Sequence, residues 1–238
     1  VQVSPVTKFH SGAGYQYEDS VIYGFTHTNK GHWNLCHIPL LPVTGTPTPG
    51  DYCSPFSHER ESAAPGYYQV FLDRYGVDAQ LSSTLRCAFH KYTYPAGAAA
   101  SLLADLQRSN EHVRAWDIRK EGDNVFAGWQ QTGEKMYFYA VANRPVTGIE
   151  PVVEGDREVR IVRFGEGDGA LELRIGFSFV SEKNARENLE AEMLGKSFAE
   201  VRSEATATWN DLLGRIRVEG GTEREKGLFY SSLYRSFL

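Results

Sequence analysis

The stretch with the richest mixture of chemically useful side chains runs from Gly24 to Asn34 and reads GFTHTNKGHWN. It brings together two imidazoles, an ammonium group, two carboxamides, two hydroxyls and an indole within eleven residues. An indole stacks on the apolar C–H face of a sugar ring, and amides, imidazoles and hydroxyls exchange hydrogen bonds with sugar hydroxyls. The segment therefore favours a polyol ligand, although an ordinary polar surface loop has a similar composition.

The overall composition agrees with an uncharged ligand. The 238 residues suffice for one large all-β domain or two small domains, and 30 acidic against 25 basic residues give a net charge of -5. Neither sign forms a long run, so the sequence lacks the electrostatic footprint of a nucleic-acid partner. No apolar run reaches the length of a membrane span. The 13% aromatic content, 23 glycines and 10 prolines favour a β-rich fold.

Neither the cysteines nor the histidines have the spacing of a metal site. No C-x-x-C pattern is present, so we expect isolated buried thiols at Cys36, Cys53 and Cys87. Three histidines recur every five residues, at positions 27, 32 and 37. In an extended chain the middle one points away from the other two, and a helix spreads them as well. We therefore assign no metal ligand in this chain.

Alternating apolar residues begin at Tyr67 and predict a hairpin, with a turn at residues 74–76 that leads into one long strand over residues 77–90. In such a strand Val77 and Phe89 share one face. Arg86 and His90 lie on the opposite face, where they project the same way and could reach one site.

Many further segments have the length of a strand. Residues 98–106 fit either a helix or a strand, and we favour a strand. Five more candidates follow, separated by turns that contain Gly, Asp or Pro: residues 113–119, 124–131, 135–142, 157–164 and 171–180. So many strands at short spacing predict an antiparallel β-sandwich.

The hydrophobic period changes after Ser181, and we predict a helix over residues 182–193. Two capping boxes, in which Ser197 precedes Glu200 and Thr222 precedes Glu225, then predict the starts of two more helices. The last apolar stripe is still in mid-period at residue 238. We therefore expect this chain to be a fragment of a longer protein with a helical domain downstream.

Several blocks of the sequence resemble the N-terminal region of glycoside hydrolase family 92. In order they are GYQYED from Gly14, GFTHT from Gly24, LLPVTG from Leu40, FSHERESAAPGYYQV from Phe56, RCAFHKYTYP from Arg86, GFSFVSEKNARENLEAE from Gly176 and WNDLLGRIRVEGG from Trp209. Each block alone is weak evidence. Together they span nearly the whole chain in consistent order, which makes the match specific.

The resemblance implies an exo-acting α-mannosidase that depends on calcium and inverts the anomeric centre. The implied fold is mainly β: an antiparallel, supersandwich-like β-sandwich over residues 1–180, a helical linker over 181–221, and the first helix of a truncated (α/α)6 barrel over 222–238. In the family the acid, the base and the calcium ligands lie in the barrel. The implied partners are α-mannosides or mannose-containing glycans and the chain's own barrel, and the fragment alone is expected to be inactive.

Inverting chemistry needs two carboxyl groups about 6.5 to 9.5 Å apart on opposite sides of the sugar. Glu59 and Glu61 lie on one loop, and Glu18 and Asp19 are adjacent, so we assign no catalytic residue. We expect the sandwich to supply a wall of the substrate pocket instead. The proposed substrate-binding residues, led by His27 of the GFTHT block, are His27, Thr28, Lys30, His32, Trp33, Asn34, His58, Arg86 and His90.

The sequence departs from the family pattern directly after GFTHT. Many members continue with a His-Leu-Ser-Gly-Thr-Gly run, whereas this chain has NKGHWN from Asn29 to Asn34. The difference bears on which mannosidic linkage is cut. Lys30 could suit an anionic substituent such as phosphate or could be solvated, and we favour the solvated side chain.

Two rival hypotheses come from other functional classes. The chain could be a carbohydrate-binding sandwich without catalytic duty, or a structural module that only stabilises the barrel. The helix predicted from Thr222 fits the start of a barrel better than the end of a lectin. Because family members are mostly bacterial and exported, analogy suggests a secreted, periplasmic or cell-surface location.

Overall fold

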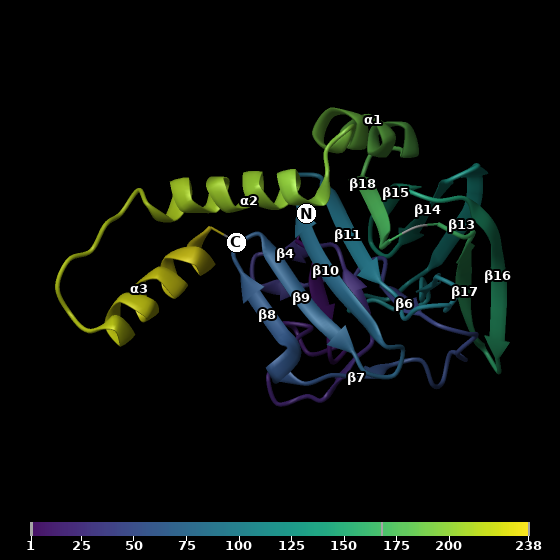
Figure 1. The fold of residues 1–238 in the computed structure, drawn as a ribbon, viewed down its shortest axis with the longest axis horizontal. Helices are drawn as coiled ribbons and strands as arrows, with labels where there is room; N and C mark the ends of the chain where they lie inside the picture. The colour runs from purple at the N-terminus through teal and green to yellow at the C-terminus, as the bar shows by residue number, and fades with distance from the viewer. Residues whose placement is uncertain (1, 168, 238) are drawn as a thin grey trace.

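The computed structural model describes residues 2–167 and 169–237, and it is mainly β, as predicted (Figure 1). Two large antiparallel sheets dominate the fold. The six-stranded sheet has the order β1 (Ser4–Val6), β3 (Gly24–Thr26), β6 (Leu40–Val43), β12 (Ser101–Ala104), β17 (Arg157–Phe164) and β16 (Val146–Glu154). The eight-stranded sheet has the order β13 (Ala115–Gly122), β14 (Val125–Gln131), β15 (Lys135–Ala142), β18 (Leu171–Ser178), β11 (Cys87–Thr93), β10 (Val77–Ser83), β9 (Tyr67–Leu72) and β8 (Glu61–Ala64).

Shorter elements decorate the two sheets. β2 (Val21–Ile22) pairs with β7 (Ser54–Pro55), and β4 (Asn29–Lys30) pairs with β5 (Trp33–Asn34). A 3-10 turn, η1 (His58–Arg60), precedes β8. The chain then continues into α1 (Glu182–Met193), α2 (Phe198–Leu213) and α3 (Glu223–Ser236). In Figure 1, α3 lies at the far end of the molecule from β16.

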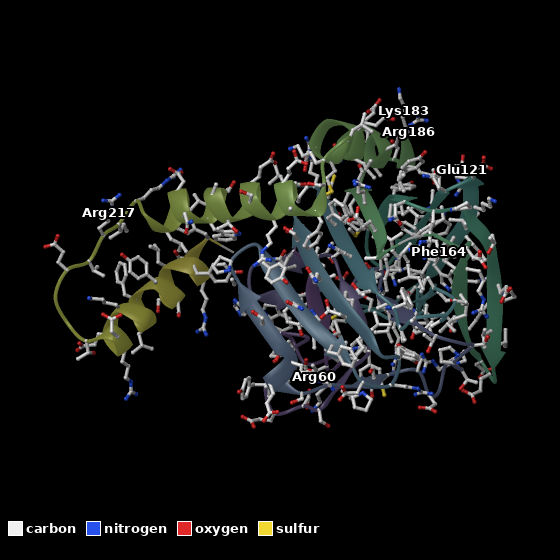
Figure 2. All side chains as sticks on the ribbon, viewed as in Figure 1. Arg60, Glu121, Phe164, Lys183, Arg186 and Arg217 are labelled. Carbon is white, nitrogen blue, oxygen red and sulfur yellow. The ribbon has the colours of Figure 1, made fainter. Side chains whose placement is uncertain are left out.

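The main core fills the space between the two large sheets. Strand β15 illustrates how the sequence builds it, since Met136, Phe138 and Ala140 are buried in this core while the residues between them point to the other face. Phe164, labelled in Figure 2, reaches the same core from the six-stranded sheet. Alternation of apolar residues along strands such as β15 therefore specifies a sandwich, as the sequence predicts.

A second apolar cluster lies on the outer face of the eight-stranded sheet, under α1 and α2. It contains Phe89, Leu189, Met193, Phe198 and Val201. The helices thus form a third layer, and the charged side chains Lys183 and Arg186 of α1 point outward in Figure 2. No helix in the described part of the chain is long and apolar enough to cross a membrane.

The helix boundaries agree with the sequence. α1 covers residues 182–193, as predicted, and Ser197 and Thr222 each close a capping box with the glutamate three residues later. The ambiguous segment 98–106 contains strand β12, which supports the choice of a strand. All five later strand predictions differ from the observed bounds by at most a few residues, as β13, β14, β15, β17 and β18 show.

Three expectations were wrong. The predicted long strand is a hairpin of β10 and β11, closed at residues 84–86, in which Leu81 faces His90 across the strands. Because the turn changes the alternation, Phe89 packs under the helices instead of sharing a face with Val77, and Arg86 lies in the turn. Strand β16 was missed altogether. All three cysteines are free, but Cys53 is only partly buried.

Candidate functional site

A cavity of about 490 Å³ lies where the sandwich meets the start of α1. Its walls come from the segment after β3, from the β10–β11 turn and from the β18–α1 junction. The lining residues are His27, Thr28, Asn29, Leu85, Arg86, Met136, Phe177, Ser178, Phe179, Val180, Asn184 and Asn188. We call this cavity, with all of these lining residues, the junction pocket. It brings together three of the predicted substrate-binding residues, His27, Thr28 and Arg86.

The side chain of His27 is fully buried behind this pocket. It is the first member of a chain of hydrogen bonds. Its Nε2 lies 3.1 Å from His90 Nε2, and His90 Nδ1 lies 2.5 Å from the hydroxyl of Tyr92. The Tyr92 hydroxyl has no other acceptor among the described residues, so it donates to His90 Nδ1. His90 then donates from Nε2 to His27 Nε2, which leaves the proton of His27 on Nδ1.

Both imidazoles are neutral in this environment. Burial lowers the pKa of His27 to about 3, against smaller opposite effects from the carbonyl oxygens of Ile38 and His37. Burial also lowers the pKa of His90 well below its usual value, and the neighbouring His27 adds to the effect. A side chain with so low a pKa cannot supply a proton as a general acid near neutral pH. His27 therefore cannot protonate a ligand near neutral pH.

Two buried polar atoms of pocket-lining residues have no hydrogen-bond partner in the part of the chain that the structure describes. They are Nδ1 of His27 and Oγ1 of Thr28. Buried polar atoms in native proteins are nearly always paired. Because the carbonyl oxygens of Ile38 and His37 act on the His27 ring, Thr28 Oγ1 is the clearer candidate for pairing with a ligand, a water or another part of the protein.

Arg86 forms the opposite wall and is tied to α1. Its Nε donates to Glu192 Oε1 at 2.5 Å, and its backbone N–H donates to Glu192 Oε2 at 3.0 Å. Thr84 Oγ1 also donates to Glu192 Oε2, at 2.5 Å. Although burial opposes ionisation, these hydrogen bonds from Thr84 and Arg86 lower the pKa of Glu192. The carboxylate thus locks the β10–β11 turn onto the helix.

The β4–β5 hairpin carries the exposed part of the predicted site. Lys30 pairs with Trp33 across a turn at Gly31, whose φ of 59° favours glycine. The Trp33 side chain is 58% exposed, and Lys30 and His32 are exposed beside it. Asn29 also borders a second cavity of about 820 Å³, which α1, α2 and Phe237, directly after α3, help to line. The hairpin therefore faces the side of the sandwich on which the helices lie.

Lys30, His32 and Trp33 of the hairpin do not line the junction pocket, and neither do three further predicted residues, His90, Asn34 and His58. His90 lies behind His27, and Asn34 is buried, where its Oδ1 accepts from Cys36 N at 2.8 Å and its Nδ2 donates to Ser4 Oγ at 2.9 Å. His58 lies beside β8, stacked on Tyr17 with the ring centroids 4.1 Å apart. As ligand contacts these three remain predictions, and each has a structural partner in this geometry.

The surroundings of His58 favour its protonated form. Its Nδ1 donates to Glu61 Oε2 at 2.5 Å, and its Nε2 donates to the carbonyl oxygen of Tyr17 at 2.8 Å. Both partners are acceptors, so both ring nitrogens must carry protons. The hydrogen bond to Glu61, followed by the one to Tyr17, raises the pKa of His58 accordingly.

The sequence reading missed one polar cluster beside the hairpin. His37, Glu111 and Thr132 converge there from three distant parts of the chain, with His37 Nε2 2.9 Å from Glu111 Oε2. The only signal in the sequence was the row of histidines that includes His37. Within residues 2–167 and 169–237, no group of three or more His, Cys, Asp or Glu side chains could hold a metal ion.

The structure is thus a two-sheet sandwich with a layer of helices, and imidazole, guanidinium and amide groups line the pocket at their junction. The chain belongs to glycosyl hydrolase family 92. Residues 1–189 match the model of the glycosyl hydrolase family 92 N-terminal domain, and residues 184–238 match that of the glycosyl hydrolase family 92 catalytic domain.

Relatives of known structure share the fold over almost the whole chain. The family GH92 α-mannosidase BT3965 from Bacteroides thetaiotaomicron is 26% identical, with a TM-score of 0.88 over 98% of this chain and 37% of that one. The GH92 family glycosyl hydrolase ccman5 is 27% identical, with a TM-score of 0.85 over 99% of this chain and 37% of that one. A curated relative, an "Uncharacterized secreted glycosidase" of Arthroderma benhamiae, is 23% identical over 99% of this chain and 37% of its own length. This chain thus spans about 37% of these relatives.

Proposed function

We propose that the protein carrying this chain is an exo-acting, inverting α-mannosidase, and that this chain forms one wall of its mannoside pocket. The observation that carries the proposal is the junction pocket in a member of family 92, with His27, Thr28 and Arg86 beside the helices. Family relatives named α-mannosidases support the substrate class. The name of the Arthroderma benhamiae relative supports secretion.

Each element of the wall has a physical task. The exposed indole of Trp33 offers an apolar face on which a sugar ring stacks. His27, neutral and held by His90, offers an oriented hydrogen-bonding group, and Thr28 offers a hydroxyl. A sandwich that packs against a helical domain also excludes water from the sugar, which strengthens hydrogen bonds in the pocket. The acid and the base are proposed to come from the helical catalytic domain.

Calcium, which the family resemblance implies, would bind oxygen ligands and supply a fixed positive charge beside the sugar. The described residues gather no cluster that fits such an ion. Because the family resemblance implies ligands in the catalytic domain, we propose the calcium site there and derive no step through it. The division into a sandwich over residues 1–180, a linker over 181–221 and a first barrel helix over 222–238 is proposed on the same basis.

The test compares the full-length protein with the isolated chain on an α-linked mannobiose, with and without a calcium chelator. We expect turnover only by the full-length protein, loss of turnover with chelator and recovery on adding calcium.

Replacing Trp33 by Ala in the full-length protein should raise KM about 2- to 10-fold, because the stacking contribution is lost. Leu194→Ala, which removes another exposed apolar side chain that does not line the junction pocket, is the control.

Two outcomes would contradict the proposal. Turnover by the isolated chain would refute the division of labour between the two domains. Unchanged kinetics in Trp33→Ala and His27→Ala, with folding intact, would instead indicate a purely structural sandwich.

A further inference from the structure

The backbone beside the hairpin is strained around one buried side chain. Cys36 and Ile38, which flank His37, have φ angles of 55° and 52°. Left-handed backbone is uncommon for residues other than glycine and is a clear outlier for a β-branched residue such as Ile38. Strain of this kind persists only when surrounding contacts enforce it, and it concentrates at functional sites.

Two side-chain amides enforce the strain. Asn34 Oδ1 accepts from Cys36 N at 2.8 Å, and Gln130 Oε1 accepts from Ile38 N at 2.8 Å. Gln130 is itself fixed, since its Nε2 donates to the carbonyl oxygens of Leu106 and Arg108, each at 2.9 Å. These hydrogen bonds thus hold the backbone on both sides of His37 in one conformation.

His37 in turn holds a carboxylate. Burial lowers the pKa of His37 despite the opposing effect of Glu111, so the ring is neutral and donates from Nε2 to Glu111 Oε2 at 2.9 Å. Thr132 Oγ1 donates to the same oxygen at 2.7 Å. The hydrogen bond from Thr132, followed by that from His37, lowers the pKa of Glu111, which is therefore ionised.

The other oxygen of this carboxylate is available. Glu111 Oε1 takes part in none of the hydrogen bonds within the described residues, and the side chain is 43% exposed. The ammonium of Lys30, on the β4–β5 hairpin, is close enough to contribute to the lowered pKa of Glu111. An oriented, ionised acceptor thus lies beside the only cationic side chain of the hairpin.

We propose that Glu111 is a substrate-binding and specificity-determining residue: its Oε1 accepts hydrogen bonds from sugar hydroxyls, and its charge makes the site select neutral mannosides over anionic ones. Glu111 offsets the attraction of Lys30 for a phosphate group and repels that group directly. His37 is a positioning residue that acts through Glu111. The inference deepens the proposed function and rests on it.

The experiment measures selectivity in the full-length protein. kcat/KM is determined for an α-linked mannobiose and for the same disaccharide carrying one phosphate monoester, and binding of both sugars is measured by calorimetry. In Glu111→Gln, we expect the preference for the neutral sugar to fall about 5- to 10-fold, because a like charge has been removed from the site. Lys30→Gln should shift the preference in the opposite direction.

The control is Glu59→Gln, which makes the same change of charge at an exposed residue of η1 and should leave the preference unchanged. Thermal unfolding checks that each variant is folded, and Glu111→Ala, which removes the same charge, decides the question should Glu111→Gln fail to fold. An unchanged neutral-to-anionic ratio in folded Glu111→Gln would overturn the proposal. Failure of the wild-type protein to cleave either sugar would refute the mannosidase function, and the ratio of binding constants would then still decide the role of Glu111.

Discussion

The buried pair His27 and His90 links binding geometry to stability. Both pKa values are lowered by burial, that of His27 to about 3, whereas an unfolded histidine titrates near pH 6.5. The unfolded state therefore binds more protons than the folded state below about pH 6.5. For His27, the stabilisation is complete above the unfolded pKa of about 6.5 and is lost as the pH falls from there towards the folded pKa of about 3.

This linkage predicts the pH dependence of unfolding. The free energy of unfolding, measured with urea between pH 4 and pH 7.5, should fall with decreasing pH, with a contribution of up to about 1.4 kcal/mol per pH unit from each buried histidine. His90→Leu should remove one such contribution and flatten the curve. Equal slopes for the wild type and His90→Leu would show that His90 titrates normally in the fold.

At the scale of single residues, the sequence revealed the site only in part. His27 was predictable from the sequence because it lies in a recognisable block, GFTHT. Glu111 was not, because it lies in an ordinary polar run, and its partners His37 and Thr132 are 74 and 21 residues away. Asn34 was assigned to ligand binding because the chemistry that recognises a sugar hydroxyl also recognises a backbone N–H. Composition cannot separate those two uses.

At the scale of elements, α1 is seated on strand β18 by a close approach. A Cβ atom at Gly176 would lie 2.1 Å from the carbonyl oxygen of Ala185 and 2.8 Å from Leu189 Cβ. The absence of a side chain therefore allows the helix to contact the sheet, and it fixes the wall of the junction pocket next to Phe177.

Gly176→Ala should push α1 away from β18 and lower the free energy of unfolding by about 1 to 3 kcal/mol, the usual cost of overpacking. The matched control is Gly148→Ala, because a Cβ atom there would have no neighbour within 4 Å. That variant should change stability by less than about 0.5 kcal/mol. Urea unfolding of both variants measures the difference, and equal stability would mean that α1 can shift at no cost.

The elements that the sequence predicted well have local signals. Capping boxes fix where α2 and α3 begin, and strict alternation fixes β15 and β18. Strand β16 was missed because Gly148 and Pro151 interrupt its sequence pattern. The structure tolerates them because β16 lies at the edge of the sheet, where one side of the strand has no partner strand. The β10–β11 turn was missed because residues 84–86 contain neither glycine nor proline.

At the scale of the whole molecule, burial decreases along the helices away from the sandwich. In α2, Phe198 and Val201 are buried, whereas α3 has no buried residue within its described part. α3 stacks on α2 through the rings of Trp209 and Tyr234, 4.6 Å apart. Its Leu228 side chain is 61% exposed. Such a helix gains little from packing against this chain, which agrees with the proposal that it belongs to a helical domain.

Amide hydrogen exchange tests that assignment on the isolated chain and on the full-length protein. In the isolated chain, we expect α3 amides to exchange nearly as fast as unfolded ones, because a 14-residue helix with little buried surface is only marginally stable. In the full-length protein, contacts with the catalytic domain should slow their exchange at least tenfold. Amides of β11, in the centre of the eight-stranded sheet, are the internal control and should be equally protected in both proteins. Equal protection of α3 in both would assign the helix to the sandwich and its linker instead, since no downstream contact would then be needed to hold it.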